Sequence, residues 1–105
     1  MNDFIQVFMT AEKKEEAESI AGAVVEKRLA ACAQVLGPIR SRYWWKDKVE
    51  TSEEWLCIMK SRKALFENLE KTIREMHPYD VPEIVALPIV SGSRDYLKWL
   101  SKEIL

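Results

Sequence analysis

ACAQVLGPIRSRYWWKDKVETSEEWLCIMKS, residues 31–61 of this 105-residue chain, decides the fold. Two strand-like runs meet at Lys46-Asp47, and the outer half of the first run alternates its side chains between two faces, as a strand does. If Lys46 and Asp47 form the loop of a hairpin, the facing pairs are Trp45 with Lys48, Tyr43 with Glu50, and Arg40 with Glu53. The last pair places opposite charges side by side, which supports this register.

The outer part of this hairpin is too long and too aromatic to stand alone. About 8 residues separate Pro38 from the loop, so at roughly 3.4 Å per residue the arm is on the order of 27 Å long. An isolated two-stranded ribbon is marginally stable in water, yet this one carries Tyr43, Trp44, Trp45 and Trp55. One interpretation is that the hairpin curls back over its own domain. We favour the other, in which these four aromatic residues form an interface between copies of the chain.

Composition and charge describe one globular domain, residues 1–105. Hydrophobic residues make up 48% and charged residues 31%, which excludes disorder, and the net charge of -1 attracts neither nucleic acid nor an anionic membrane. No apolar run reaches the ~20 residues that cross a bilayer, and the first residues do not resemble a secretion signal. The two cysteines form no Cys-x-x-Cys pair and are expected to be reduced thiols, so we expect a cytoplasmic protein.

The spacing of apolar residues predicts alternating strands and helices along the chain. Thr10, Ser61 and Ser93 are the expected helix caps, and Pro78 ends the second helix by His77. The expected elements are strand 4–9, helix 12–29, strand 31–36 with a bend at Gly37-Pro38 before the arm, a return strand ending in 55–59, a second helix, strand 81–90 and a closing helix.

This order of elements is the βαββαβ arrangement of the ferredoxin-like α+β folds, with an extra C-terminal helix and a long hairpin between the second and third strands. In such folds two helices cover one face of an antiparallel sheet. The other face is left open, and we expect subunits to meet there or at the edges beside it.

Five short motifs, in the same order along nearly the whole chain, are similar to the CutA1 family of divalent-cation tolerance proteins. They are Arg28-Leu29-Ala30-Ala31-Cys32, Tyr43-Trp44-Trp45 with Lys48, Lys60, His77-Pro78-Tyr79-Asp80-Val81-Pro82-Glu83, and Tyr96-Leu97 with Trp99-Leu100. The resemblance implies a tight homotrimer of ferredoxin-like subunits with strands paired across subunits. It also implies a role in tolerance of copper and other divalent metals, without an assigned catalytic reaction.

The resemblance further implies a metal site. The family places ligands on a cysteine at the end of the first strand and on two histidines before Pro-Tyr, and this chain has Met9, Met76 and His77 at those positions. Two thioethers and one imidazole suit the soft ion Cu(I) better than Cu(II) or zinc. The alternative is that His77, the single histidine, ends a helix and hydrogen-bonds nearby backbone.

Three other polar residues, Lys60, Tyr79 and Glu83, match motif positions of the family and are expected to line a ligand cleft between subunits. The alternative is an inter-subunit ion pair between Lys60 and Glu83 with a hydrogen bond from Tyr79. The acidic run at residues 50–54 is expected to be a solvated face of the hairpin.

Catalytic signatures are missing from the sequence. Cys32 and Cys57 lie on predicted strands and are expected to pack as small core residues, although Cys57 and Met59 share a face and a soft-metal pair is the alternative. Neither cysteine has a histidine base assigned by a motif, there is no Gly-x-Ser-x-Gly elbow, and the glycines are too isolated to form a phosphate loop.

Three hypotheses follow. The first is a non-enzymatic, cytoplasmic homotrimer that binds copper or another divalent metal in metal homeostasis. The second is a PII-like trimeric module that senses a small ligand; it ranks lower because PII-like proteins present a long flexible loop where this chain has a short, aromatic turn. The third is an enzyme whose site lies between chains and uses Lys60, Tyr79, Glu83 and His77.

Overall fold

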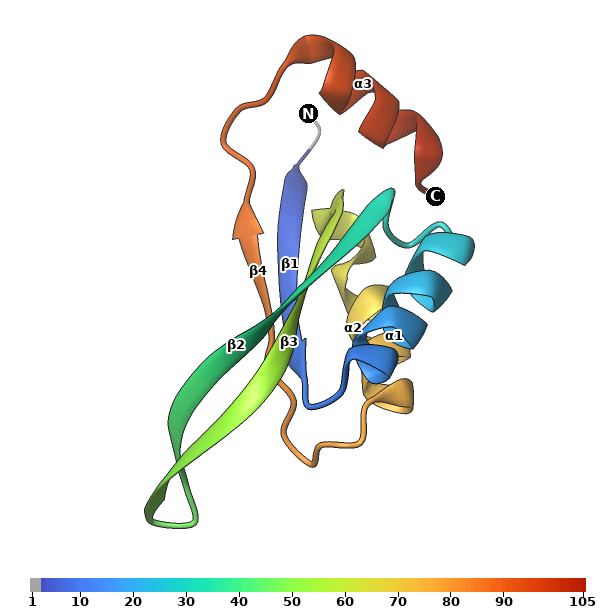
Figure 1. Cartoon of the computed structure of the whole chain (residues 1–105). Coiled ribbons are helices and arrows are strands. Elements are labelled where there is room, and N and C mark those ends of the chain that lie inside the picture. The colour runs from blue at the N-terminus through green and yellow to red at the C-terminus, as the bar shows by residue number, and fades with distance from the viewer. Residues whose placement is uncertain (1–2) are drawn as a thin grey trace.

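Residues 3–105, the part of the chain that the computed structural model describes, form four strands and three α-helices (Figure 1). The strands pair in the order β2-β3-β1-β4, and each pairing is antiparallel. This is the predicted ferredoxin-like order. The elements are β1 (Phe4–Ala11), α1 (Lys14–Glu26), β2 (Cys32–Trp45), β3 (Lys48–Arg62), a 3-10 turn (Lys63–Leu65), α2 (Phe66–Met76), β4 (Ile84–Pro88) and α3 (Arg94–Glu103).

The core lies between one face of the sheet and the helices α1 and α2 (Figure 1). Val7 and Met9 of β1 point into it together with Met59 of β3, and all three are fully buried. The residues between them point to the opposite face because side chains alternate along a strand. That face carries exposed Leu36, Val85 and Leu87, so α1 and α2 leave this apolar surface uncovered.

The first helix is shorter than the predicted range 12–29. Thr10 is not its cap, because this residue pairs with Leu56 in the ladder between β1 and β3. The helix instead begins after Lys13, whose backbone N–H donates to the carboxylate of Glu16 at 3.2 Å. It ends early because Arg28 has a positive φ of 59° and turns the chain toward β2.

The second helix does not begin at Ser61, which was the predicted cap. Ser61 is the buried partner of Ile5 in the sheet, and its hydroxyl donates to the Leu29 carbonyl at 2.6 Å. A 3-10 turn then leads into α2, which ends at Met76 immediately before His77, as Pro78 predicted. None of the helices in residues 3–105 has the length and hydropathy required to span a membrane.

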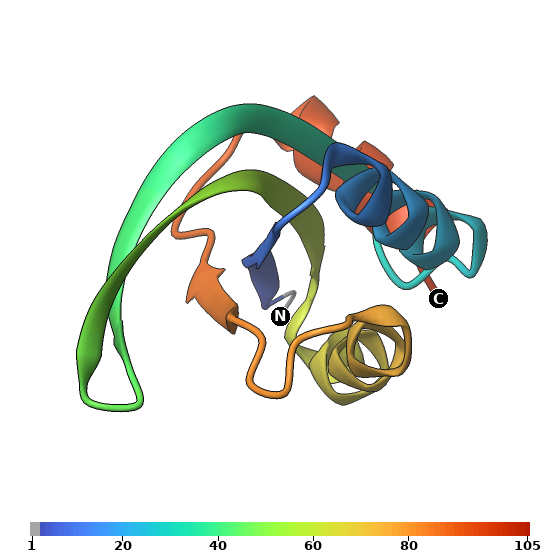
Figure 2. The same ribbon diagram turned by 60° about the horizontal axis from the view of Figure 1, so that its bottom comes forward.

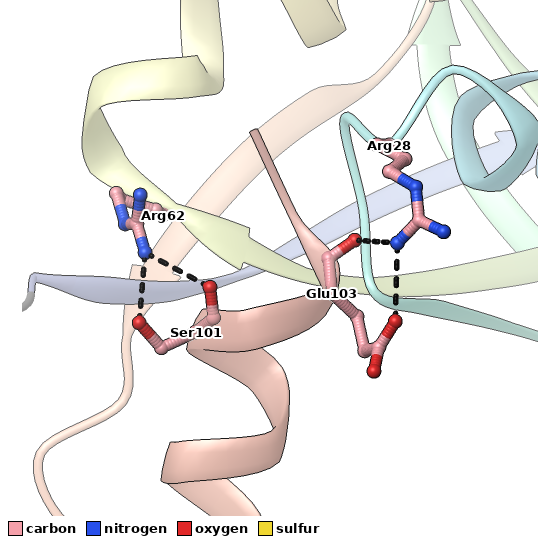
Figure 3. A network of polar contacts seen from close by, with 4 residues as sticks. All are labelled: Arg28, Arg62, Ser101 and Glu103. Carbon is pink, nitrogen blue, oxygen red and sulfur yellow. Dashed lines mark hydrogen bonds and ion pairs between the residues drawn. The ribbon is translucent and has the colours of Figure 1, made fainter.

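The closing helix α3 packs across the end of the sheet, where Leu100 and Ile104 cover Phe4. Ser93 caps it as predicted, accepting from the backbone N–H of Tyr96 at 3.4 Å. Two arginines fasten its C-terminal end (Figure 3). They are Arg28, which donates to the carboxylate of Glu103 at 3.0 Å, and Arg62, which donates to the Ser101 hydroxyl at 3.0 Å.

The strand before this helix, β4, covers residues Ile84–Pro88 only, and the predicted range 81–90 is wrong at both ends. Residues 81–83 belong instead to the loop that follows α2. Pro82 and Pro88 lack the N–H that a ladder needs, and Pro88 is the last residue of the strand.

The hairpin of β2 and β3 has the predicted register, with Arg40 opposite Glu53 and the turn at Lys46-Asp47. A bulge between Leu36 and Ile39 marks the point where the arm leaves the sheet. Figure 2 shows that the arm bends into a hook beyond the other strands. It extends the molecule to 44 × 25 × 22 Å and raises the radius of gyration to 14.3 Å, above the roughly 13 Å of a compact chain of this length.

Candidate functional site

The imidazole of His77 is held by two backbone groups at the end of α2. Its Nε2 lies 2.7 Å from the carbonyl oxygen of Thr10, and its Nδ1 lies 3.1 Å from the backbone N–H of Tyr79. A carbonyl only accepts and an amide N–H only donates, so Nε2 carries the proton and Nδ1 accepts. His77 is 8% exposed, and through these two hydrogen bonds its ring joins β1 to the loop after α2.

The three residues of the expected metal set do not form a metal site within one chain. Met9 is 0% exposed in the core, whereas Met76 is 42% exposed at the surface. Both ring nitrogens of His77 are engaged as described, so a metal ion would have to displace one of these hydrogen bonds. Within residues 3–105 there is also no group of three or more His, Cys, Asp or Glu residues that could hold a metal ion.

Tyr79 connects the same loop to the base of the hairpin. Its hydroxyl donates to Oε2 of Glu54 at 2.9 Å, and its ring packs edge-on against His77 with the centroids 4.6 Å apart. Burial raises the pKa of Tyr79 above its usual value, and the hydrogen bond to Glu54 and the charge of that carboxylate raise it further. Tyr79 is therefore held as a neutral donor.

Glu54 is a residue of the candidate site that the sequence pattern did not single out. The acidic run at residues 50–54 was expected to be a solvated face, but Glu54 is only 6% exposed. It pairs with Ile39 in the ladder and so lies on the same face of the hairpin as Tyr43 and Trp45. The alternation of side chains along the hairpin could have placed Glu54 on this aromatic face. The neighbouring charged residues suggested a solvated surface instead.

A cavity of about 770 Å³ lies between the inner side of the hairpin and the loop that follows α2. Glu54 and Tyr79 line it together with Asp80 and Glu83 from the loop. The hairpin contributes Tyr43, Trp44 and Trp45. Its volume is within the usual range for small-molecule sites, and its walls combine aromatic surface with carboxylates.

Lys60, the third member of the expected ligand cleft, does not reach this cavity within one chain. Lys60 follows Glu54 by six residues on β3, which corresponds to about 20 Å along the strand. Its ammonium group donates to Oε1 of Gln34 at 2.9 Å. Tyr79 and Glu83 therefore share a cavity and Lys60 lies apart from it.

The two cysteines occupy different environments. Cys57 is buried in the core, and burial raises the pKa of its thiol to about 11, so it remains protonated. Cys32 is only half-buried on the face of the sheet opposite α1 and α2, where its Sγ lies 3.6 Å from the hydroxyl of Tyr96 in α3. Burial, followed by this contact, raises the pKa of Tyr96 to about 12.

The four aromatic residues of the hairpin divide into two groups. Trp55 packs against the core of its own chain, and the Lys14 ammonium lies 5.5 Å from its ring centre. Tyr43, Trp44 and Trp45 are exposed near the tip, and Trp44 is the most open of them at 74%. The tip therefore presents aromatic surface that its own chain does not cover.

Comparisons of sequence point to one family. The model of the CutA1 divalent ion tolerance protein family matches residues 5–103. The divalent-cation tolerance protein CutA of Thermus thermophilus is 44% identical over 94 residues, 90% of this chain and 91% of the relative. A chloroplastic CutA protein of Oryza sativa is 43% identical over 96 residues, which are 91% of this chain but 54% of the relative. The chain thus spans about half the length of some curated relatives.

Comparisons of structure agree with this result. A divalent cation tolerance protein structure from Thermus thermophilus aligns with a TM-score of 0.95 at 40% identity and covers 97% of this chain and 99% of the other. The CutA1 structure from Oryza sativa aligns with a TM-score of 0.96 at 39% identity, covering 99% and 95%. A CutA structure from Archaeoglobus fulgidus, described as periplasmic, aligns with a TM-score of 0.94 at 36% identity and covers 97% and 99%. This chain belongs to the CutA1 divalent ion tolerance family.

Proposed function

We propose that this protein acts in divalent-cation tolerance as a non-enzymatic, cytoplasmic homotrimer that binds copper or another divalent metal ion. The observation that carries the proposal is the match of nearly the whole chain to the CutA1 divalent ion tolerance family, of which the Thermus thermophilus relative is named a divalent-cation tolerance protein. The two free cysteines are compatible with a reducing compartment. Some relatives are described as chloroplastic or periplasmic, so the compartment has to be tested separately from metal binding.

Two surfaces support assembly with other copies of the chain. The hairpin tip exposes Tyr43, Trp44 and Trp45, and the uncovered sheet face exposes Leu36, Val85 and Leu87. Apolar and aromatic areas of this kind mark interaction sites on soluble proteins. In the proposed trimer the tip aromatics lie against a neighbouring subunit, and Trp55 extends the contact from the base of the arm.

The proposed metal ligands are Met9, Met76 and His77, which the family pattern implies. Their fit is poor within one chain because Met9 is in the core and His77 is engaged by backbone groups. We therefore expect modest affinity and a preference for the soft ion Cu(I). Among the three, Met76 is exposed and is the residue that an arriving ion reaches first.

Native mass spectrometry with Cu(I), Cu(II) and Zn(II) tests this proposal. A three-chain assembly that retains copper, and loses it in the Met76→Leu variant, is the expected result. Met59→Leu is the matched control, because Met59 is fully buried and both substitutions conserve volume. A three-chain assembly that retains none of the ions, even in excess metal, would contradict metal binding but not the proposed trimer.

A second candidate function, sensing of a small ligand, is favoured by one specific observation. The cavity of about 770 Å³ contains Tyr79 and Glu83, two of the three residues expected to line a ligand cleft. A metal ion needs several strong donors at close range, whereas this cavity offers space and aromatic surface. We therefore place ligand sensing as the alternative to metal binding.

A further inference from the structure

Lys60 carries a positive charge that no carboxylate of its own chain neutralises within residues 3–105. Its neighbours in the sheet are Gln6 on β1 and Cys32 on β2, and its ammonium group donates to Oε1 of Gln34 at 2.9 Å. An amide oxygen accepts this hydrogen bond but carries no full charge. The two ion pairs in that part of the chain do not include Lys60.

This charge lies on the face of the sheet that α1 and α2 leave uncovered. Met59 is buried in the core, so the alternation of side chains along β3 directs Lys60, the next residue, to the opposite face. That face also exposes Leu36, Val85 and Leu87. In the proposed trimer a neighbouring copy covers this apolar surface and removes Lys60 from water. Because a buried charge is costly unless an opposite charge meets it, we expect the neighbouring copy to supply a carboxylate there.

Glu83 is an exposed carboxylate on the same side of the sheet. It directly precedes Ile84 of β4, whose side chain packs against the core, and is therefore directed to the other face. Neither ion pair within residues 3–105 includes it. Glu54 also lies on this face, but it is only 6% exposed and already accepts a hydrogen bond from Tyr79. Glu83 is thus the better partner for a charge on another copy.

Lys60 and Glu83 do not meet within one chain. Lys60 pairs with Gln6, and Gln6 pairs with Leu87, so these three residues lie in one row across the sheet. Glu83 is four residues before Leu87, about 13 Å along the strand, and β4 lies two strand spacings, about 10 Å, from β3. The Lys60 ammonium is also turned the other way, toward Gln34 on β2. An opposite charge for either residue therefore has to come from another copy.

The two charges lie toward opposite edges of the sheet. β2 and β4 are its outer strands; the Lys60 ammonium is directed toward β2, and Glu83 adjoins β4. When identical copies join head to tail, one edge of each copy meets the opposite edge of the next, and the rotation can close into a ring. Complementary charges at the two edges suit this arrangement, because each contact brings together one positive and one negative group.

We propose that Lys60 forms an ion pair with Glu83 of the neighbouring copy, and that this pair selects the head-to-tail orientation of the homotrimer. Copies that meet in the wrong orientation place like charges together or leave a charge buried without a partner. A buried pair of this kind acts on specificity more than on stability. The inference rests on the homotrimer proposed above and is independent of metal binding. It assigns the ion pair, of the two roles that the sequence leaves open for these residues.

Exchange of the two charges tests the inference, by sedimentation velocity at micromolar concentration with circular dichroism to confirm folding. In Lys60→Glu and in Glu83→Lys like charges meet at each contact, and we expect self-association to weaken about tenfold or more. The double variant Lys60→Glu/Glu83→Lys restores opposite charges and is expected to regain the three-chain mass. Lys71→Glu is the matched control and should keep that mass, because exposed Lys71 belongs to α2, which covers the other face of the sheet.

An unchanged three-chain mass in both single variants would overturn the ion pair and leave the homotrimer standing, whereas a wild-type monomer would contradict both. A folded double variant that associates no better than the single variants, or an equal loss in Lys71→Glu, would also overturn it. If a reversed charge prevents folding, the neutral variants Lys60→Gln and Glu83→Gln decide the question. Their losses of association should not add in the double variant if the two groups are paired, and additive losses would contradict the pair.

Discussion

The hydroxyl of Tyr79 links the loop after α2 to Glu54 at the base of the hairpin. In Tyr79→Phe the buried carboxylate of Glu54 loses its hydrogen-bond donor, and we expect the free energy of unfolding to fall by about 1–3 kcal/mol. Urea unfolding at pH 7 measures this. Tyr96→Phe is the control, because its hydroxyl contacts the thiol of Cys32 rather than a buried carboxylate, and a change within about 0.5 kcal/mol is expected. Equal losses in the two variants would contradict the role of Glu54.

The same residue predicts how stability changes at alkaline pH. The pKa of Tyr79 is raised in the folded chain, by burial first and then by Glu54, above its ordinary value of 10.0. A raised pKa stabilises the fold fully below the unfolded value, and the contribution is lost as pH rises through the folded value. Wild type should therefore lose stability above about pH 10 more steeply than Tyr79→Phe, in unfolding titrations followed by circular dichroism. Parallel pH curves for the two proteins would be inconsistent with this assignment.

Gly37, at the bulge where the arm leaves the sheet, has little space for a side chain. An added Cβ would lie 2.9 Å from Cε3 of Trp55, and the φ of +155° disfavours other residues. We expect Gly37→Ala to cost about 1–3 kcal/mol in the free energy of unfolding, measured with urea. Gly22→Ala is the matched control, because Gly22 lies in α1 with nothing within 4 Å and should gain up to about 1 kcal/mol. An unchanged free energy of unfolding in Gly37→Ala would contradict this close contact, because it would mean that the Trp55 ring moves aside without cost.

At the scale of elements, the turn of the hairpin is strained. Lys46 and Asp47 have positive φ values of 50° and 64°, a pair typical of a type I′ turn, which favours glycine. We expect Asp47→Gly to raise the free energy of unfolding by up to about 1 kcal/mol, because glycine adopts the left-handed region without steric cost. Lys48→Gly, one residue further in β3, should instead lower it. A melting curve that moves the same way for both variants would exclude relief of turn strain as the cause.

The register of the hairpin could be predicted from the sequence because alternation and one pair of opposite charges, Arg40 and Glu53, act locally. The ends of α1 and α2 could not. Thr10 and Ser61 have good capping side chains, but both are used by the sheet, where pairing with β3 and β1 outweighs a cap. The hydrogen bond of the buried Glu54 likewise comes from Tyr79, which lies 25 residues away in the chain.

At the scale of the whole molecule, the core and the arm differ in how far one chain buries them. The core between the sheet and the two helices is complete within one chain, and α3 closes its end. The tip of the arm and the uncovered face of the sheet instead keep exposed apolar side chains that no other part of the chain buries. This division explains why the fold could be predicted more fully than the candidate site. A partner chain covering the arm, as proposed above, would contribute nothing to the sequence pattern within one chain.

Sedimentation velocity of the wild-type protein at micromolar concentration tests the central claim, that sister chains cover the arm. We expect one species with three times the mass of a chain, and smaller or aggregated species when Trp44 and Trp45 are both replaced by serine. A well-folded monomer of the wild type, or a double variant with unchanged mass and melting curve, would contradict it.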